Sequence, residues 1–157
     1  YMNTYISKVH EYKPSALQYL YTRYPNLDGI NFNDLELLWK VENLWINFQK
    51  QFENNPPHTH TGDLSFVIYL QVPKELVEEN KLHIQNHTQN NEGPGNIVFV
   101  YGEELFMNIN CVTKFPKRGE IIIFPAWLNH HVLSFKSDVE RISVSGNIQL
   151  DIIKKGD

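Results

Sequence analysis

The stretch "PHTHTGDLSFVIYLQVP" (57–73) places two histidines directly before an apolar run. The run from Leu64 to Val72 is rich in β-branched and aromatic residues, which favours a β-strand. In an extended chain, residues i and i+2 lie on the same side, so His58 and His60 would present two ring nitrogens to one point. The stretch therefore predicts a strand that begins beside a candidate metal site.

Other segments of the chain have a similar composition, and short polar connectors separate most of them. These further predicted strands are 44–50, 96–101, 105–112, 120–125, 130–135 and 141–152. In the first of them, alternation puts Trp45, Asn47 and Gln49 on one face of the strand. About seven strands at this spacing indicate an antiparallel sandwich or barrel.

The N-terminal part has a different pattern. Residues 15–21 follow Pro14 with helical spacing, and residues 33–39 begin with capping side chains. We therefore expect one domain over 1–157, with a helical N-terminal support over 1–43 and a β core over 44–152. The polar insertion 86–96 is expected to be a mobile surface loop.

Composition excludes some classes of partner. The chain has 157 residues, a formal charge of -4 and no run of lysine and arginine, which argues against nucleic acid. The single cysteine, Cys111, cannot form an internal disulfide. With no targeting sequence and no apolar stretch long enough to cross a membrane, we expect a soluble, cytoplasmic protein. The oligomeric state is not predicted.

A metal at the histidine pair needs a third ligand from elsewhere in the chain. His130 is the best candidate, because it begins a predicted strand after "IIIFPAWLN", whereas His131 would point to the opposite face. A binuclear zinc hydrolase would need His-x-His-x-Asp-His, and Asp63 comes one place late. A metal-dependent amidohydrolase needs a barrel of about 250 residues. A polar turn whose imidazoles make ordinary hydrogen bonds remains an alternative.

Arg141 and Ser143 share one face of a later predicted strand. An arginine that faces the interior is costly to bury unless an anion meets it, and a guanidinium beside a hydroxyl suits a carboxylate. The alternative is an exposed Arg141 that pairs with Glu140 or Asp138.

The segments "PHTHTGDLSFVIYLQVP" (57–73), "FPAWLNHHV" (124–132) and "RISVSGN" (141–147), in this order and spacing, resemble the 2-oxoglutarate- and Fe(II)-dependent oxygenases. More narrowly, they resemble a prolyl-hydroxylase-like branch found in bacteria and their viruses. The resemblance covers roughly residues 44–150 and implies a double-stranded β-helix, or jelly-roll barrel, with iron at its open end.

The resemblance also implies roles for individual residues. The iron ligands would be His58, His60 and His130, and His60 stands where the family usually has a carboxylate. Asp63, the nearby carboxylate, is the alternative ligand. The expected residues of the 2-oxoglutarate site are Arg141, Ser143, Tyr69 and Asn147.

The activity implied is hydroxylation of an unactivated C–H bond, with Fe(II) and 2-oxoglutarate as cofactor and cosubstrate and with succinate and CO2 as products. The group that is hydroxylated would be a prolyl or another side chain. Two alternatives stay open: a non-catalytic jelly-roll module that binds a metal or a carboxylate, and a cupin-type dioxygenase with three histidine ligands. Arg141 distinguishes the cupin-type dioxygenase from the 2-oxoglutarate-dependent oxygenase, because such a cupin needs no side chain that binds 2-oxoglutarate. The primary substrate is not predicted.

Overall fold

The computed structural model describes residues 25, 31–86, 92–102 and 110–156. Contacts divide the chain into two compact units, one of residues 1–38 and 150–157 and the other of residues 39–149. In the first unit, the short 3-10 helix η2 (Phe32–Asp34) precedes the first strand. The backbone N–H of Lys155 donates to the carbonyl of Asp34 at 2.7 Å, so the two ends of this unit are hydrogen-bonded to each other.

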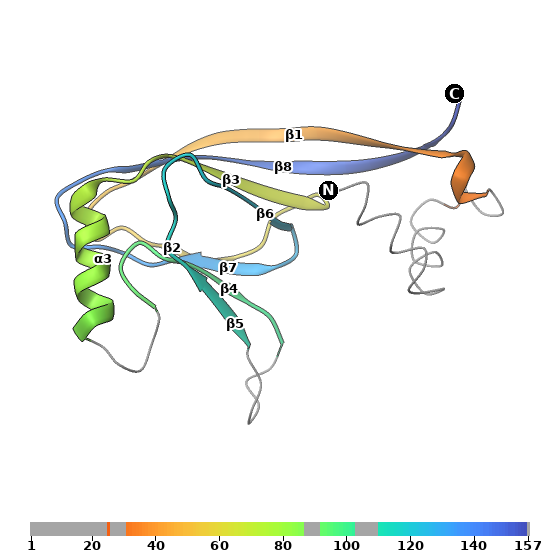
Figure 1. Ribbon diagram of the computed structural model, residues 1–157. Coiled ribbons are helices and arrows are strands. Elements are labelled where there is room, and N and C mark those ends of the chain that lie inside the picture. The colour runs from red at the N-terminus through yellow and green to blue at the C-terminus, as the bar shows by residue number, and fades with distance from the viewer. Residues whose placement is uncertain (1–24, 26–30, 87–91, 103–109, 157) are drawn as a thin grey trace. The chain divides into compact units, whose positions relative to one another are not determined.

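The strands form two four-stranded sheets (Figure 1). One has the order β1-β8-β3-β6, with strands Leu35–Gln49, Arg141–Lys154, Leu64–Gln71 and Ile121–Pro125. The other has the order β2-β7-β4-β5, with strands Asn55–His58, Asn129–Val132, Ile97–Val100 and Cys111–Lys114. Strands far apart in sequence are neighbours in both sheets, as in a jelly roll, and β3 pairs antiparallel with β6 and β8. The mainly β fold class is therefore confirmed.

The core lies between the two sheets within the second unit. Its buried apolar residues come from β3 and β6 of the first sheet and from β4 and β7 of the second: Val67, Tyr69, Phe124, Ile97, Phe99 and Val132. Burying side chains of this size removes a large apolar area from water, which is the main force that holds the sheets together.

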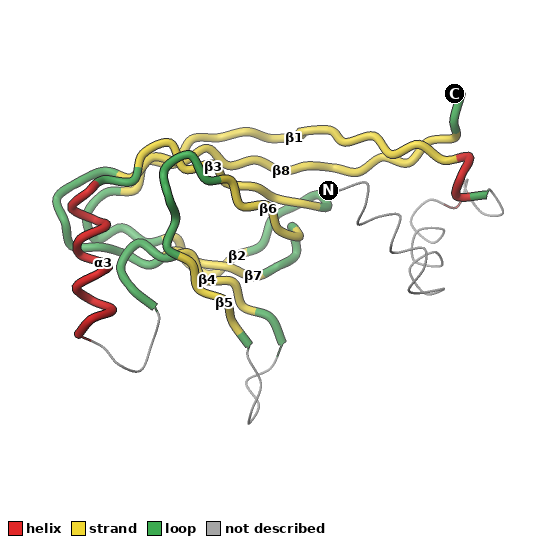
Figure 2. Tube along the Cα trace, in the orientation of Figure 1, coloured by secondary structure: helices red, strands yellow, loops and turns green. Residues whose placement is uncertain are grey.

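Helix α3 (Lys74–Asn86) is the one long helix in the described part of the chain (Figure 2). It follows Pro73, and its side chain Leu76 is completely buried. The carboxylate of Glu79 accepts the backbone N–H groups of Lys136 and Ser137, both at 2.8 Å. These bonds tie α3 to the connection between β7 and β8.

The structure corrects several sequence-based expectations. The predicted helix over 33–39 is wrong, because residues 35–39 belong to β1, whose neighbour in the sheet is β8. Tertiary pairing here overrides the local capping signal. The predicted helix over 15–21 lies outside the described residues, as does most of the predicted strand 105–112. The expected surface loop at 86–96 is wrong for its last part, because residues 93 and 95–96 are buried.

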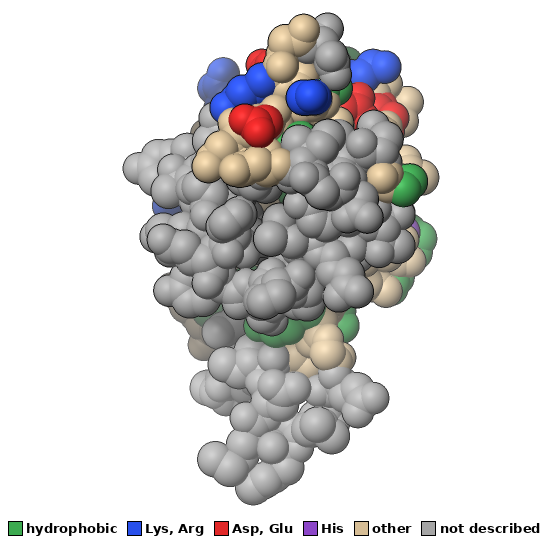
Figure 3. Space-filling model, turned by 90° about the vertical axis from the view of Figure 1, so that its right-hand side faces the viewer, with side chains coloured by type: hydrophobic (Ala, Val, Ile, Leu, Met, Phe, Trp, Pro, Cys, Tyr) green, Lys and Arg blue, Asp and Glu red, His purple; other side chains and the backbone are tan. Residues whose placement is uncertain are grey.

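Two surface properties complete the description. On the face shown in Figure 3, described acidic and basic side chains lie next to one another. None of the helices in the described ranges is long and apolar enough to cross a membrane.

Candidate metal and anion site

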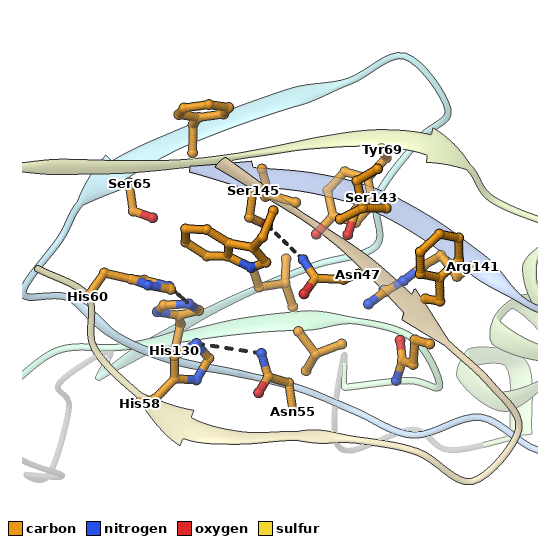
Figure 4. Close-up of a pocket in the computed structure, with 18 of the residues that line it drawn as sticks. Asn47, Asn55, His58, His60, Ser65, Tyr69, His130, Arg141, Ser143 and Ser145 are labelled. Atoms are coloured by element: carbon orange, nitrogen blue, oxygen red, sulfur yellow. Dashed lines mark hydrogen bonds between the residues drawn. The ribbon is translucent and has the colours of Figure 1, made fainter. Parts of the chain in front are cut away.

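Three histidines meet at the end of the second sheet (Figure 4). β2 and β7 are paired so that His58 lies opposite His130, with ring centroids 4.3 Å apart. His60 follows β2, and its backbone N–H donates to the carbonyl of Ala126 at 2.8 Å. One nitrogen from each of the three rings lies within 4.8 Å of the other two. The spacing of the pair and a third histidine from a later strand thus bring three imidazoles together.

Backbone carbonyls orient two of the rings. Nδ1 of His58 donates to the carbonyl of Pro56 at 2.7 Å, and Nδ1 of His130 donates to the carbonyl of Leu128 at 2.9 Å. Since a carbonyl can only accept, the proton of each neutral ring lies on Nδ1, and Nε2 keeps its lone pair. Nε2 of His130 lies 3.2 Å from Nε2 of His60, so a hydrogen bond joins these two rings.

The electrostatics of the cluster favour neutral imidazoles. Burial lowers the pKa of His130 from 6.5 to about 4, partly opposed by the bond to Leu128 and reinforced by His58, His60 and His131. Burial, and next the proximity of His58, also lower the pKa of His60. Because only a neutral imidazole can ligate a metal, these rings are in their binding form at neutral pH.

A cavity of about 590 Å³ adjoins the three rings. The Trp45 ring lies 5.5 Å from the His60 ring, between centroids. Nδ2 of Asn47 donates to Oγ of Ser145 at 2.9 Å, which joins β1 to β8 across the cavity wall. Trp45, Asn47 and Gln49, which alternation places on one face of β1, all line the cavity, and Gln49 is buried.

Arg141 lines the same cavity and is only 5% exposed. Nη1 donates to the carbonyl of Gly95 at 2.7 Å, whereas the buried Nε has no hydrogen-bond partner among the described residues. Burial lowers the pKa of Arg141, yet a guanidinium stays charged in proteins. The alternative of an exposed Arg141 paired with Glu140 or Asp138 is therefore wrong.

Tyr69 and Ser143 stand beside this guanidinium, opposite each other in the pairing of β3 with β8. Arg141 Cζ lies 5.4 Å from the centroid of the Tyr69 ring, a cation–π distance. Burial raises the pKa of Tyr69 to about 12, which the charge of Arg141 opposes and that of Glu120 reinforces. The phenol is therefore protonated at neutral pH and can donate a hydrogen bond.

Two of the residues singled out in the sequence lie elsewhere. Asn147 is not among the residues that line the cavity, and its amide bonds to Ser65 and Thr61 at 3.2 and 3.4 Å. Asp63 is not part of the histidine group. Its backbone N–H donates to the carbonyl of Ile148, and its carbonyl accepts the N–H of Ala126, which fixes the start of β3.

The side chains present fit a metal ion and a carboxylate. Three imidazole nitrogens form a donor set that suits Fe, Zn, Cu or Ni. The unpartnered Nε of Arg141 is a buried charged donor, and a carboxylate is the anion that matches the guanidinium fork. His58, His60 and His130 could hold the metal, and Arg141 with Ser143 and Tyr69 could hold the anion.

Two mainly antiparallel sheets thus enclose one cavity that carries a histidine cluster and a buried arginine. Residues 43–147 match the model of a family described as "Putative 2OG-Fe(II) oxygenase". The chain belongs to this family of 2-oxoglutarate- and Fe(II)-dependent oxygenases, and the resemblance seen in the sequence is confirmed.

A solved structure supports the fold assignment. The chain is similar to an oxidoreductase of the 2OG-Fe(II) oxygenase family from Burkholderia pseudomallei, with a TM-score of 0.52 and 14% identity. The match covers 73% of this chain and 46% of that one, so the chain spans about half the length of that relative. A comparison with curated proteins finds no match.

Proposed function

We propose that this protein is a dioxygenase that uses Fe(II), 2-oxoglutarate and O2 to hydroxylate an unactivated C–H bond, with decarboxylation of 2-oxoglutarate to succinate. The observation that supports the proposal is one cavity that joins three imidazoles to a buried arginine with an unpartnered Nε. Family membership supports the same cofactor and cosubstrate.

In this proposal, His58, His60 and His130 would hold the iron. The bound iron supplies oxidative chemistry that side chains alone cannot perform. Arg141 binds the distal carboxylate of 2-oxoglutarate, and the hydroxyl groups of Ser143 and Tyr69 can donate to the same carboxylate.

The rest of the cavity is the proposed place of the primary substrate. Trp45 of β1 offers a flat apolar surface next to His60, and the amides of Asn54 and Asn55 also line the cavity. A cavity of about 590 Å³ has room for a side chain as well as the cosubstrate. A prolyl or another side chain is the substrate that we propose.

Binding is tested first. The full chain is reconstituted anaerobically with Fe(II), 2-oxoglutarate is added, and the weak metal-to-ligand charge-transfer band is recorded in the visible spectrum. We expect the band in the parent and its loss in Arg141→Ala at the same 2-oxoglutarate concentration. Arg118→Ala, which removes an exposed arginine, is the matched control and should behave as the parent does.

Turnover is tested by succinate release under O2. Release that depends on iron and on 2-oxoglutarate supports the proposal. The absence of a band, together with an Arg141→Ala variant that is indistinguishable from the parent, would lead us to abandon it. A band without succinate under any condition would instead favour the non-catalytic binding module.

The three imidazoles also favour a second candidate, a cupin-type dioxygenase that binds its substrate directly to the metal. Such an enzyme would consume O2 without 2-oxoglutarate. Its activity would also be insensitive to Arg141→Ala, which separates the two candidates.

A further inference from the structure

The direction of the Arg141 guanidinium is set by a backbone group. Among the described residues, its hydrogen bond goes from Nη1 to the carbonyl of Gly95, at 2.7 Å. The orientation of Nε toward an anion therefore depends on where this carbonyl lies. Gly95 belongs to the segment between α3 and β4, which the function proposed above does not use.

The segment around Gly95 is a tight, buried turn. The N–H of Asn96 donates to the carbonyl of Gly93 at 3.1 Å and closes the turn. Gly95 has φ +74°, a left-handed conformation in which a side chain would be strained, and a Cβ there would lie 3.0 Å from Cδ1 of Leu76. The turn is thus packed directly onto α3, with its shape dictated by the glycine.

Asn80 of α3 holds the turn on both sides of Gly95. Its Nδ2 donates to the carbonyl of Pro94 at 2.9 Å and to Oδ1 of Asn96 at 2.8 Å. Asn80 is 3% exposed, and a Cβ on Gly93 would lie 2.6 Å from its Nδ2. The absence of a side chain at Gly93 is what gives the amide its space.

We propose that Asn80 is a positioning residue of the anion site. Its amide fixes the turn, the turn places the Gly95 carbonyl, and this carbonyl holds Arg141 so that Nε–H is directed to a carboxylate. Asn80 does not line the cavity, so it acts on the anion through Arg141 alone. The inference rests on the proposed function, in which that anion is the distal carboxylate of 2-oxoglutarate.

The test is a double-mutant cycle on 2-oxoglutarate binding, measured by calorimetry on the anaerobic, Fe(II)-loaded full chain. Asn80→Asp keeps the shape but removes both donors and sets a carboxylate against the Pro94 carbonyl. We expect the Kd to rise about 10-fold, the loss typical of one hydrogen bond to a charged group. In the Arg141→Ala background the same change should leave the Kd unaltered, because Asn80 then has nothing to position.

Controls separate positioning from general damage. Asn86→Asp makes the same chemical change at an exposed site of α3 and should bind as the parent does. Gly93→Ala disturbs the Asn80 amide from the other side and should weaken binding in the same Arg141-dependent way. Gly93→Ala also replaces Asn80→Asp as the test variant if Asn80→Asp does not fold.

Two results overturn the inference. One is an unchanged Kd in folded Asn80→Asp or Gly93→Ala, and the other is an equal effect with and without Arg141. If the parent itself does not bind 2-oxoglutarate, the proposed function fails together with the inference. If the parent binds 2-oxoglutarate and only Arg141→Ala loses binding, the inference about Asn80 is wrong and the proposed function still stands.

Discussion

The His130 imidazole should make the metal-free protein sensitive to mild acid. Its pKa lies at about 4 in the folded chain, below its usual 6.5, because burial disfavours the charged ring. The unfolded chain therefore takes up this proton first as the pH falls. Stability from this ring is complete above pH 6.5 and is lost progressively as the pH falls toward 4.

The magnitude follows from the two pKa values. At pH 5 the unfolded ring is almost fully protonated and the folded ring only slightly so, which gives a loss of about 2 kcal/mol relative to pH 7. His60, whose pKa is also lowered, adds a loss of the same sign. The loss is a substantial part of the free energy of unfolding of an ordinary domain.

The assay is urea unfolding of the EDTA-treated chain at pH 7 and pH 5, followed by circular dichroism, for the parent and for His130→Gln. The parent should lose about 2 kcal/mol more between the two pH values than the variant does. His83→Gln, which removes an imidazole of α3 outside the histidine cluster, is the control. An equal loss in the parent and in His130→Gln would refute the argument that folding holds this ring neutral.

Three further substitutions test packing, backbone conformation and a helix contact within the second unit. Gly146→Ala should destabilise the chain by about 1–3 kcal/mol in urea unfolding, since its Cβ would lie 2.6 Å from a Phe66 ring atom and 2.7 Å from the Asn43 carbonyl; a neutral result would show that the strands move apart freely. Phe52→Asn should raise the free energy of unfolding by about 0.5–1 kcal/mol, because Phe52 has φ 63° and is 67% exposed, and Asn tolerates this conformation better. An unchanged or lower thermal midpoint would contradict this. Glu79→Gln should cost about 1–3 kcal/mol, because each carboxylate oxygen accepts one backbone N–H at 2.8 Å, whereas the amide keeps one acceptor oxygen and sets its NH2 group against the other N–H. The check is the urea midpoint at pH 7, with Glu78→Gln at an exposed position of α3 as the control.

The strands that the sequence predicts best are those rich in β-branched and aromatic residues. Strands β3, β6 and β8 have this composition, and β1 alternates over its second half, where Trp45, Asn47 and Gln49 line the cavity. Strand β2 contains two prolines, which conceal it, because proline is depleted from strands. The strand character of residues 35–39 depends on the neighbouring β8, which lies about one hundred residues away and leaves no local signal.

Some residues of the site can also be predicted from the sequence, whereas others depend on the fold. The i, i+2 spacing of His58 and His60 and the strand position of His130 were sufficient to bring these rings together. The choice between His60 and Asp63 depends on the fold, because the backbone bonds of Asp63 to Ile148 and Ala126 start a strand there. The roles of Gly95 and Asn80 could not be predicted. Gly95 acts through its backbone carbonyl, which every residue has, and Asn80 lies in helix α3, which was not predicted from the sequence.

The carbonyls of Pro56 and Leu128, which accept the Nδ1 protons of His58 and His130, have a consequence for how this protein can evolve. In many metal sites a carboxylate side chain performs this task, and a single substitution can remove it. Here the acceptor persists whatever side chain stands at those two positions. Substitutions at these two positions therefore leave the tautomers of His58 and His130 unchanged. The acceptors stay neutral, so no point mutation there can change the electron donation of the rings through a change of acceptor charge.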